Sequence, residues 1–148
     1  MFIGEYQHSI DKKGRLILPA KIREVITEKY VESFIITRGL DKCLYVYPID
    51  EWKSTVEPKI KALSEAEPNA RYYKRMLYAN AAEVPIDKQG RIMIPHHLRE
   101  RNNIGRDVVI IGDSNRIEIW GKDNWEAYLK GQEGQGKSFE DIVKDLQI

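Results

Sequence analysis

One sixteen-residue stretch of this chain occurs twice. Residues 10–25 read IDKKGRLILPAKIREV and residues 86–101 read IDKQGRIMIPHHLRER, so eight of the sixteen positions are identical at an offset of 76. The similarity continues more weakly, because residues 34–52 match residues 107–125 at an offset of 73. Each copy of a repeat must solve the same burial problem, so the duplication constrains the architecture more than any local propensity does. The chain is therefore predicted to consist of two similar halves.

The repeat divides the chain into three parts. We expect a first unit over residues 1–66, a second unit over residues 67–130, and a Gly-rich linker with a C-terminal amphipathic helix over residues 131–148. A single half of this length would bury its core poorly. We therefore expect the two copies to form one body.

Charge is distributed unevenly along the chain. The net charge is only +1, from 24 Lys and Arg against 23 Asp and Glu, so overall basicity does not indicate a nucleic-acid partner. Residues 10–29 nevertheless carry six basic against three acidic residues, whereas residues 118–148 carry four lysines against seven carboxylates. A local basic stripe is what a nucleic-acid-binding surface needs, although most charge clusters are simply solvated faces.

Cysteine content and hydropathy exclude several classes of protein. Cys43 is the only cysteine, so neither an intrachain disulfide nor a cysteine-based zinc site can form. The N-terminal residues lack a basic region followed by a long apolar core, and no apolar run approaches 18 residues. The sequence predicts a cytoplasmic protein without a membrane partner.

Periodicity and turn residues predict the same order of elements in both copies. A strand over residues 2–10 leads through a tight hairpin turn at residues 11–14 into a short apolar strand, and Pro19 then opens a helix. A second hairpin and further helices follow. The sequence thus predicts an α+β fold with a mainly β core, made of two tandem β-β-α-β-β-α-like repeats.

Helix boundaries in the connecting and C-terminal segments are predicted from capping signals. Asp50 is expected to cap a helix that Pro58 kinks or restarts, and Asn69 to open the next one. Residues 131–136 are expected to form a flexible linker because three of the six are glycine. Beyond it, Ser138 and Asp141 resemble a capping box, and apolar residues recur with helical spacing.

Each copy contains the motif Asp-Lys-x-Gly-Arg, followed by three apolar residues and proline. This pattern predicts a tight turn in which Asp11 or Asp87 accepts hydrogen bonds from nearby backbone amides and Gly14 or Gly90 takes a left-handed conformation. A purely structural interpretation remains open, because an Asp and an Arg four residues apart can pair and hold the register of the turn.

The cations of these turns suggest a binding role. Lys12, Lys13 and Arg15 repel one another on a tight turn unless an anion neutralises them, and phosphate is the obvious partner. Lysine contributes affinity for nucleic acid through counterion release, whereas an arginine can make a bidentate contact with guanine that discriminates by about 1–3 kcal/mol. The second copy offers Lys88 and Arg91 but has glutamine at the position of Lys13, so it is less basic.

Other polar and aromatic residues are weaker candidates. Adjacent His96 and His97 point about 100° apart on a helix, and no carboxylate cluster accompanies them, so neither a metal site nor a catalytic role is expected. The aromatic residues have strand or helix spacing, which favours core packing over base stacking; they are Tyr45, Tyr47, Trp52, Trp120 and Trp125. Tyr72 and Tyr73 are expected to bury against the β core or a neighbouring subunit. No nucleotide-binding loop, serine nucleophile elbow or zinc-protease motif occurs, so we expect no enzyme and no cofactor.

The duplicated Asp-x-x-x-Arg element, the run GRLILPAKIR, the opening FIGEYQHSID and the chain length together resemble the MraZ family, which is related to the AbrB/SpoVT regulators. The resemblance covers essentially the whole chain. It implies a swapped-hairpin (double-split) β-barrel and a ring-shaped homo-oligomer. It also implies a cytoplasmic, nucleoid-associated transcriptional regulator of the division and cell-wall gene cluster that includes its own gene. By this resemblance, Arg15 corresponds to the family's DNA-binding arginine, and Arg91 is its counterpart in the second copy. Lys13 is expected to assist Arg15 in binding DNA.

Symmetry predicts the form of the DNA site. Identical subunits that close head to tail into a ring present their DNA-binding turns in one rotational direction. Such a ring matches direct repeats in the DNA, whereas a two-fold dimer matches a palindrome. An alternative function is a ring-forming scaffold for division or envelope proteins, in which the charged turns bind an acidic protein surface. A salt series on cognate and scrambled duplexes separates the two functions, because specific binding survives at salt concentrations that release random DNA.

Overall fold

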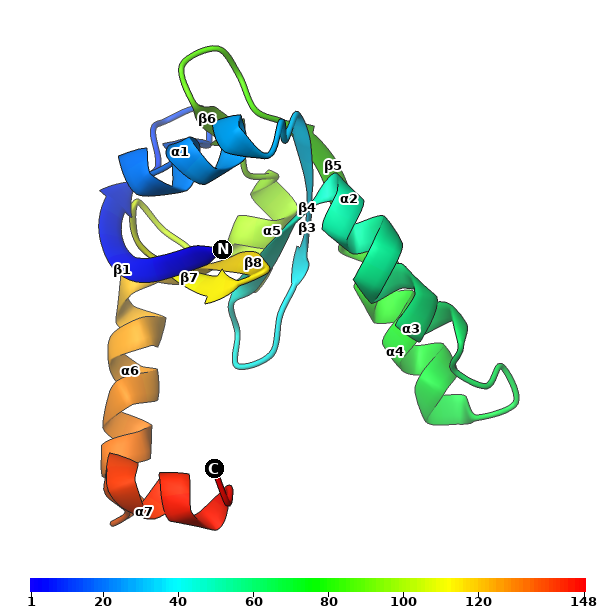
Figure 1. Ribbon diagram of the computed structural model, residues 1–148, viewed down its shortest axis with the longest axis vertical. Coiled ribbons are helices and arrows are strands. Elements are labelled where there is room, and N and C mark those ends of the chain that lie inside the picture. The colour runs from blue at the N-terminus through cyan, green and yellow to red at the C-terminus, as the bar shows by residue number, and fades with distance from the viewer.

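The computed structural model describes all residues from Met1 to Ile148, and the same order of elements occurs twice (Figure 1). The first copy contains β1 (Phe2–Ser9), β2 (Arg15–Ile17), α1 (Ala20–Glu28), β3 (Ser33–Arg38), β4 (Leu44–Pro48), and a helical segment made of α2 (Ile49–Glu51), the π-helix η1 (Trp52–Val56) and α3 (Glu57–Lys61). Helix α4 (Pro68–Ala79) leads to the second copy, which contains β5 (Ala82–Pro85), β6 (Arg91–Met93), α5 (His96–Arg101), β7 (Asp107–Ser114), β8 (Arg116–Gly121), α6 (Lys122–Glu133) and α7 (Phe139–Asp145). The predicted α+β class with a mainly antiparallel sheet core is confirmed.

Strands of the two copies interleave. The main sheet has the order β1-β7-β8-β4-β3-β5, and all its neighbours are antiparallel. Three of its five pairings, β1 with β7, β4 with β8 and β3 with β5, join strands from different copies. The sheet is open, with β1 and β5 at its edges, and no closed barrel is formed.

The short strands β2 and β6 form a separate two-stranded ribbon. Arg15 lies opposite Met93, Leu16 opposite Ile92, and Ile17 opposite Arg91. The predicted hairpin between β1 and β2 is confirmed only next to its turn, where Ile10 bridges to Leu16 and the N–H of Asp11 donates to the Arg15 carbonyl; along its length β2 pairs with β6 instead. The turn reverses the chain as predicted, but each short strand takes its partner from the other copy, because only there does it find a second short strand to pair with along its length.

A single large hydrophobic core unites both copies. Its 19 buried residues come from both copies, with the ribbon, α1 and α5 contributing as well as the sheet. Leu16 and Ile92 are almost fully buried beneath the ribbon. Because successive strand residues point to opposite faces, the residues on either side of them face outward. The core thus fixes which face of the ribbon is exposed.

Two smaller clusters attach the helices to the sheet. In one, Trp52, Ile60 and Leu77 from the helices pack against Ile35 and Tyr47. In the other, Trp125 and Tyr128 of α6 pack on Trp120 beside Cys43 and Val109. The prediction of core packing is confirmed for the buried rings of Tyr47, Trp52 and Trp120. Tyr72 and Tyr73 differ, because 63% and 46% of their surfaces are exposed.

Helix starts differ from several predictions by one or two residues. Pro48 occupies the N-cap of α2, so Asp50 lies in the first turn and caps nothing. Glu67 caps α4 by accepting a hydrogen bond from the backbone N–H of Asn69, which is already inside the helix. Pro58 does restart the helix: it lies in the first turn of α3, directly after η1, so its missing N–H falls where the helix changes from π to α geometry.

The C-terminal segment extends away from the body of the protein (Figure 1). Helix α6 runs through Gly131 to Glu133, so the connection before α7 is shorter than the predicted linker. Ser138 and Asp141 form the predicted capping box at the start of α7. No helix of the protein is both long enough and apolar enough to cross a bilayer.

Candidate nucleic-acid interface

The first turn is organised by one carboxylate. Asp11 Oδ1 accepts hydrogen bonds from the backbone N–H groups of Lys13 and Arg15, both at 2.9 Å, and Asp11 Oδ2 pairs with Arg15 Nε at 2.7 Å. Gly14 closes the turn by donating to the Asp11 carbonyl, with φ at +87°, a conformation that favours glycine. One aspartate thus fixes both the turn backbone and the position of the Arg15 side chain.

The second turn repeats this arrangement. Asp87 Oδ1 accepts from the N–H groups of Gln89 and Arg91, both at 2.9 Å, and Asp87 Oδ2 pairs with Arg91 Nε at 2.8 Å. Gly90 closes this turn with φ at +79°. The structural pairing that the sequence left open is therefore present in both copies, and it holds each arginine by one edge of its guanidinium.

Hydrogen bonds stabilise the charged form of both aspartates. The N–H of Arg15 is the largest cause that lowers the pKa of Asp11, with the Arg15 side chain and the Lys13 N–H adding to it against some desolvation. The pKa of Asp87 is lowered by the corresponding groups, the N–H of Arg91 foremost. Both carboxylates stay ionised at neutral pH, so the two arginines remain held.

The ribbon carries both arginines on its exposed face. Arg15, Ile17, Arg91 and Met93 lie on the face opposite the core residues Leu16 and Ile92. Each guanidinium uses only Nε within the protein, so its two terminal nitrogens have no hydrogen-bond partner there. Ile17 and Met93, the last residues of β2 and β6, are 47% and 45% exposed, so the outward face of the ribbon offers apolar as well as cationic side chains.

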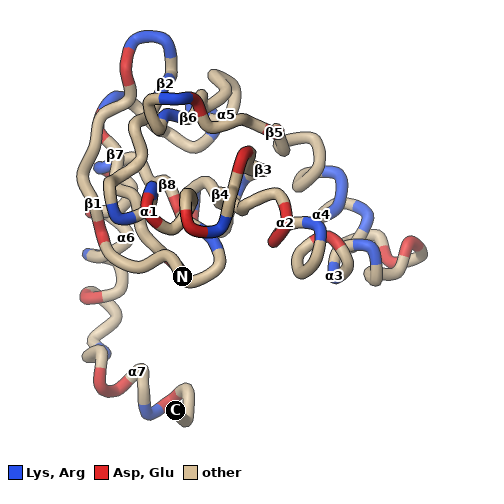
Figure 2. Tube along the Cα trace, turned by 45° about the horizontal axis from the view of Figure 1, so that its top comes forward, with Lys and Arg blue, Asp and Glu red and all other residues tan.

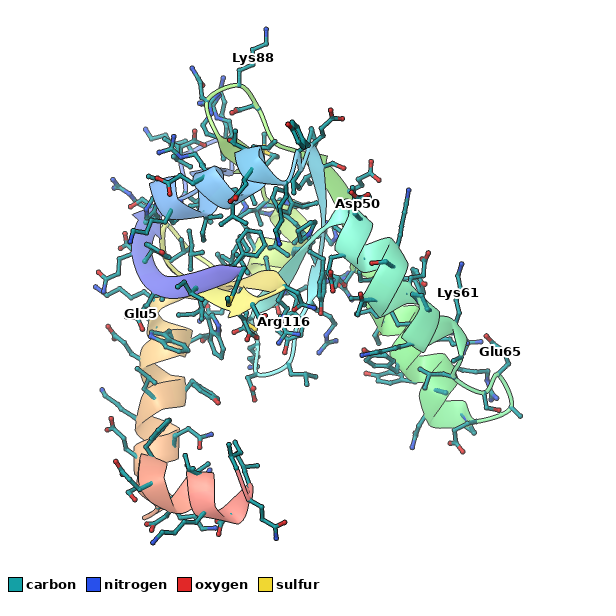
Figure 3. The ribbon with its side chains drawn as sticks, in the orientation of Figure 1. Glu5, Asp50, Lys61, Glu65, Lys88 and Arg116 are labelled. Carbon is teal, nitrogen blue, oxygen red and sulfur yellow. The ribbon has the colours of Figure 1, made fainter.

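The turns flank this face with further cations. Lys12, Lys13 and Lys88 are exposed and take part in no ion pair. Lys88 extends from the tip of its turn, away from the body of the protein (Figure 3). Figure 2 shows Lys and Arg gathered near β2 and β6, at the opposite end of the molecule from α7. We call the exposed ribbon face and the two turns the turn-and-ribbon surface: residues 11–15, Ile17, residues 87–91 and Met93.

The two turns are locked to each other across the copies. The N–H of Leu18 donates to the Gly90 carbonyl at 3.0 Å, and the N–H of Ile94 donates to the Gly14 carbonyl at 2.9 Å. Each strand that leaves one turn is thereby bonded to the opposite turn. The spacing of Arg15 and Arg91 is consequently set by the rigid ribbon rather than by loops.

Two more arginines support the turns, and sequence reasoning missed their role. Arg99 of α5 covers the first turn, so that a Cβ at Gly14 would lie 3.0 Å from Arg99 Nη2, and Arg23 of α1 packs in the same way against Gly90. Their Nε groups donate to the carbonyls of Ile94 and Leu18. A signal existed: the spacing Pro-x-x-x-Arg occurs in both copies. It did not show that each arginine serves the opposite copy.

The histidines form no metal centre. His96 lies 3.6 Å from Glu100 on the surface of α5, and no group of three metal-ligating side chains occurs anywhere in the protein.

These observations define a class of protein: a tandem duplication with an interleaved antiparallel sheet and a basic two-stranded ribbon stabilised by a pair of Asp-x-x-x-Arg turns. A model of the MraZ family, described as "MraZ protein, putative antitoxin-like", matches residues 1–76 and again residues 77–146. The chain belongs to the MraZ family. It is 49% identical over 146 residues to a protein of Caldanaerobacter subterraneus subsp. tengcongensis named "Transcriptional regulator MraZ", covering 99% of this chain and 96% of that relative.

Proposed function

We propose that this protein is a sequence-specific transcriptional regulator that binds double-stranded DNA through the turn-and-ribbon surface. The observation that carries the proposal is the exposed ribbon face with its two preorganised arginines. A two-stranded ribbon is one of the two elements that the major groove of DNA admits. The name of the relative, a transcriptional regulator, supports the same function.

The surface offers all three kinds of contact that such a complex needs. The unpaired guanidinium edges of Arg15 and Arg91 suit the O6 and N7 acceptors of guanine, and Ile17 and Met93 suit the methyl group of thymine. Lys12, Lys13 and Lys88 supply phosphate contacts, which set position and affinity without reading sequence. The ion pairs with aspartate restrict the arginines before DNA arrives, which reduces the entropy lost on binding.

We also propose that copies of this protein associate with one another. A ring-shaped homo-oligomer would present its heads in one rotational direction, so the DNA site would consist of direct repeats in the promoter of the gene cluster that includes its own gene. Several heads engaged together raise the effective concentration of each one, which makes weak individual contacts useful. The ribbon, which takes β2 from one copy and β6 from the other, supports assignment of the two copies together to the swapped-hairpin architecture of the AbrB/SpoVT regulators.

Fluorescence anisotropy tests the proposal directly. A labelled duplex from upstream of the protein's own gene is titrated with wild-type protein, with Arg15→Ala and with Arg75→Ala, over a salt series and beside a scrambled duplex. Arg75 is a matched control because it is exposed, unpaired and located on α4. We expect Arg15→Ala to abolish selective binding with the oligomer intact and Arg75→Ala to bind as wild type. Binding that ignores both the DNA sequence and Arg15 would instead favour the scaffold function.

A further inference from the structure

Helix α7 is an amphipathic helix without a partner. Its apolar residues Phe139, Ile142, Val143 and Leu146 recur with helical spacing; Ile142 and Val143 are half-buried, whereas Phe139 is 77% exposed and Leu146 is 64% exposed. The hydrophobic clusters of the protein include no residue beyond Tyr128. Because the capping box fixes the start of the helix locally, its apolar stripe is already formed and available for contact.

A groove of about 640 Å³ lies elsewhere on the same chain. Its walls are the β3–β4 hairpin, η1 and α4, and aromatic rings dominate its lining, with Tyr45, Tyr47 and Trp52 inside and Tyr72 and Tyr73 at the opening. Leu40, at the tip of the hairpin, is 67% exposed. Nine of the fifteen residues that line this groove are hydrophobic, and none of the fifteen belongs to the turn-and-ribbon surface.

The groove and the helix carry opposite charge. Arg38 and Lys42 line the groove and form no ion pair, whereas Asp41 is the only carboxylate in the lining. Arg116, near the foot of the hairpin in Figure 3, lies 3.7 Å from the Tyr45 ring centre and is neutralised by Asp113 and Glu118. The groove therefore presents two free cations.

One acidic residue of the tail complements these cations. Of the three carboxylates in residues 138–148, Asp141 belongs to the capping box and Asp145 pairs with Lys137, so only Glu140 is free. Glu140 forms no ion pair and lies one residue after Phe139, so it borders the apolar stripe at about 100° around the helix. The apolar stripe of α7, with the free carboxylate of Glu140 beside it, is therefore complementary to the aromatic groove with its two free cations.

We propose that α7 of one copy docks in the aromatic groove of a second copy. The inference rests on the self-association proposed above and names the contact that carries it. Since the helix and the groove are different surfaces of the same chain, their contact is heterologous, and repetition of it generates a ring or a filament rather than a two-fold dimer. In this binding mode an amphipathic helix lies with its apolar face in a hydrophobic groove. The contact leaves the turn-and-ribbon surface free for DNA.

Disulfide trapping between differently marked chains tests the contact. A chain with Leu146→Cys is co-expressed with a chain with Tyr73→Cys, and the purified oligomer is mildly oxidised. The native Cys43 does not interfere, because it is buried and burial raises the pKa of its thiol to about 12. We expect a two-chain species on a non-reducing gel, which can include up to about half of the chains when the two kinds mix at random in a head-to-tail ring. Ile3→Cys replaces Leu146→Cys as the matched control, because Ile3 is also 64% exposed but lies on β1, and it should give no such species.

Mass in solution provides the second measurement. Phe139→Glu combined with Leu146→Glu is expected to reduce the oligomer to smaller species while the circular dichroism spectrum stays that of the folded wild-type chain, because neither residue belongs to the core. Lys144→Ala, on the opposite side of α7, should keep the wild-type mass.

Three outcomes would overturn the docking. The doubly substituted chain Tyr73→Cys with Leu146→Cys could crosslink only within itself, which would place α7 in its own groove. The mixed chains could fail to crosslink while the oligomer and selective DNA binding persist, which would leave the proposed function standing and the contact wrong. A wild-type chain that is monomeric and binds no DNA would overturn the proposed function as well.

Discussion

The two Asp-x-x-x-Arg turns have the same geometry and different charge. Their aspartate-to-arginine distances are 2.7 and 2.8 Å, and all four Oδ1 hydrogen bonds measure 2.9 Å. Lys13 in the first turn is nevertheless glutamine in the second. The third position contributes only its backbone N–H to the turn, so its side chain is free to vary. The turn geometry and the affinity for an anion are therefore encoded by different residues.

The largest effect is expected beneath the turns, where the copies depend on each other. Leu16→Ala and Ile92→Ala each remove a side chain that is at most 1% exposed, so each should lower the free energy of unfolding by about 2–5 kcal/mol. Since the two residues lie opposite each other, their double variant should deviate from additivity. Denaturant unfolding at fixed protein concentration measures both effects. Losses below 0.5 kcal/mol, typical of surface sites, would show that the ribbon is not part of the core.

Substitutions of Arg15 and Arg91 compare how much each of the two turns contributes to DNA binding. Arg15→Ala and Arg91→Ala should each weaken binding to the cognate duplex by about 1–3 kcal/mol for each engaged subunit if each guanidinium reads a base, so that the losses of several engaged subunits together remove selective binding. Anisotropy at one salt concentration gives both values, and Arg75→Ala again serves as the control. Equal losses would show that the ribbon binds as a symmetric unit. A loss confined to Arg15→Ala would show that the extra charge of the first turn decides which head binds.

Removal of the aspartates tests the shared geometry. The folded pKa of Asp11 is lowered, so its hydrogen bonds stabilise the protein above the ordinary pKa of about 3.9 and this stability disappears as the pH falls through the folded pKa. Asp11→Asn should therefore flatten the stability profile below about pH 4, and Asp87→Asn should do so to a similar extent.

Unfolding followed between pH 5 and pH 2 measures this change. Asp50→Asn is the control, because Asp50 is exposed and accepts no hydrogen bond from a neighbouring side chain or turn. The same variants should bind random DNA at least as tightly as wild type, because each loses a negative charge from this surface, but select poorly between sequences, since their arginines lose the partner that positions them. Wild-type profiles in both assays would mean that the aspartates position nothing.

Local features of this chain were predictable from sequence. The duplication, the two turns with Gly14 and Gly90 and the capping box at Ser138 each depend on residues within a few positions of one another, and the structure contains them. The helix starts were less accurate, because Pro48 and Glu67 compete with Asp50 and Asn69 for the same caps. The division of the chain at residues 66 and 130 stays a prediction.

The sequence did not predict which distant segments pair or pack with each other. A short strand such as β2 can pair with β1 or with β6, and the difference depends on how both copies bury Leu16 and Ile92 together. Arg23 and Arg99 were missed for the same reason, since each supports the turn of the other copy. Tyr72 and Tyr73 do not bury against the β core, and Leu77 is the buried residue of α4; burial of the two tyrosines against a neighbouring subunit stays a prediction.

The smallest expected effect comes from exchanging the one charge that distinguishes the turns. Lys13→Gln gives the first turn the residue of the second, and Gln89→Lys does the reverse; both side chains are exposed, so stability should not change. If Lys13 contacts a phosphate, Lys13→Gln should reduce the slope of log K against log salt by about 0.9 for each engaged subunit.

Gln89→Lys makes this comparison decisive. The slope should steepen by the same amount only if the second turn also lies against the DNA backbone, because a new cation that faces solvent releases no counterion from DNA. Lys144→Gln on α7 controls for the change in net charge. An unchanged slope for Gln89→Lys beside a reduced slope for Lys13→Gln would mean that the two turns, although built alike, have divided the work: the first contacts the DNA backbone, and the second completes the ribbon that supports it.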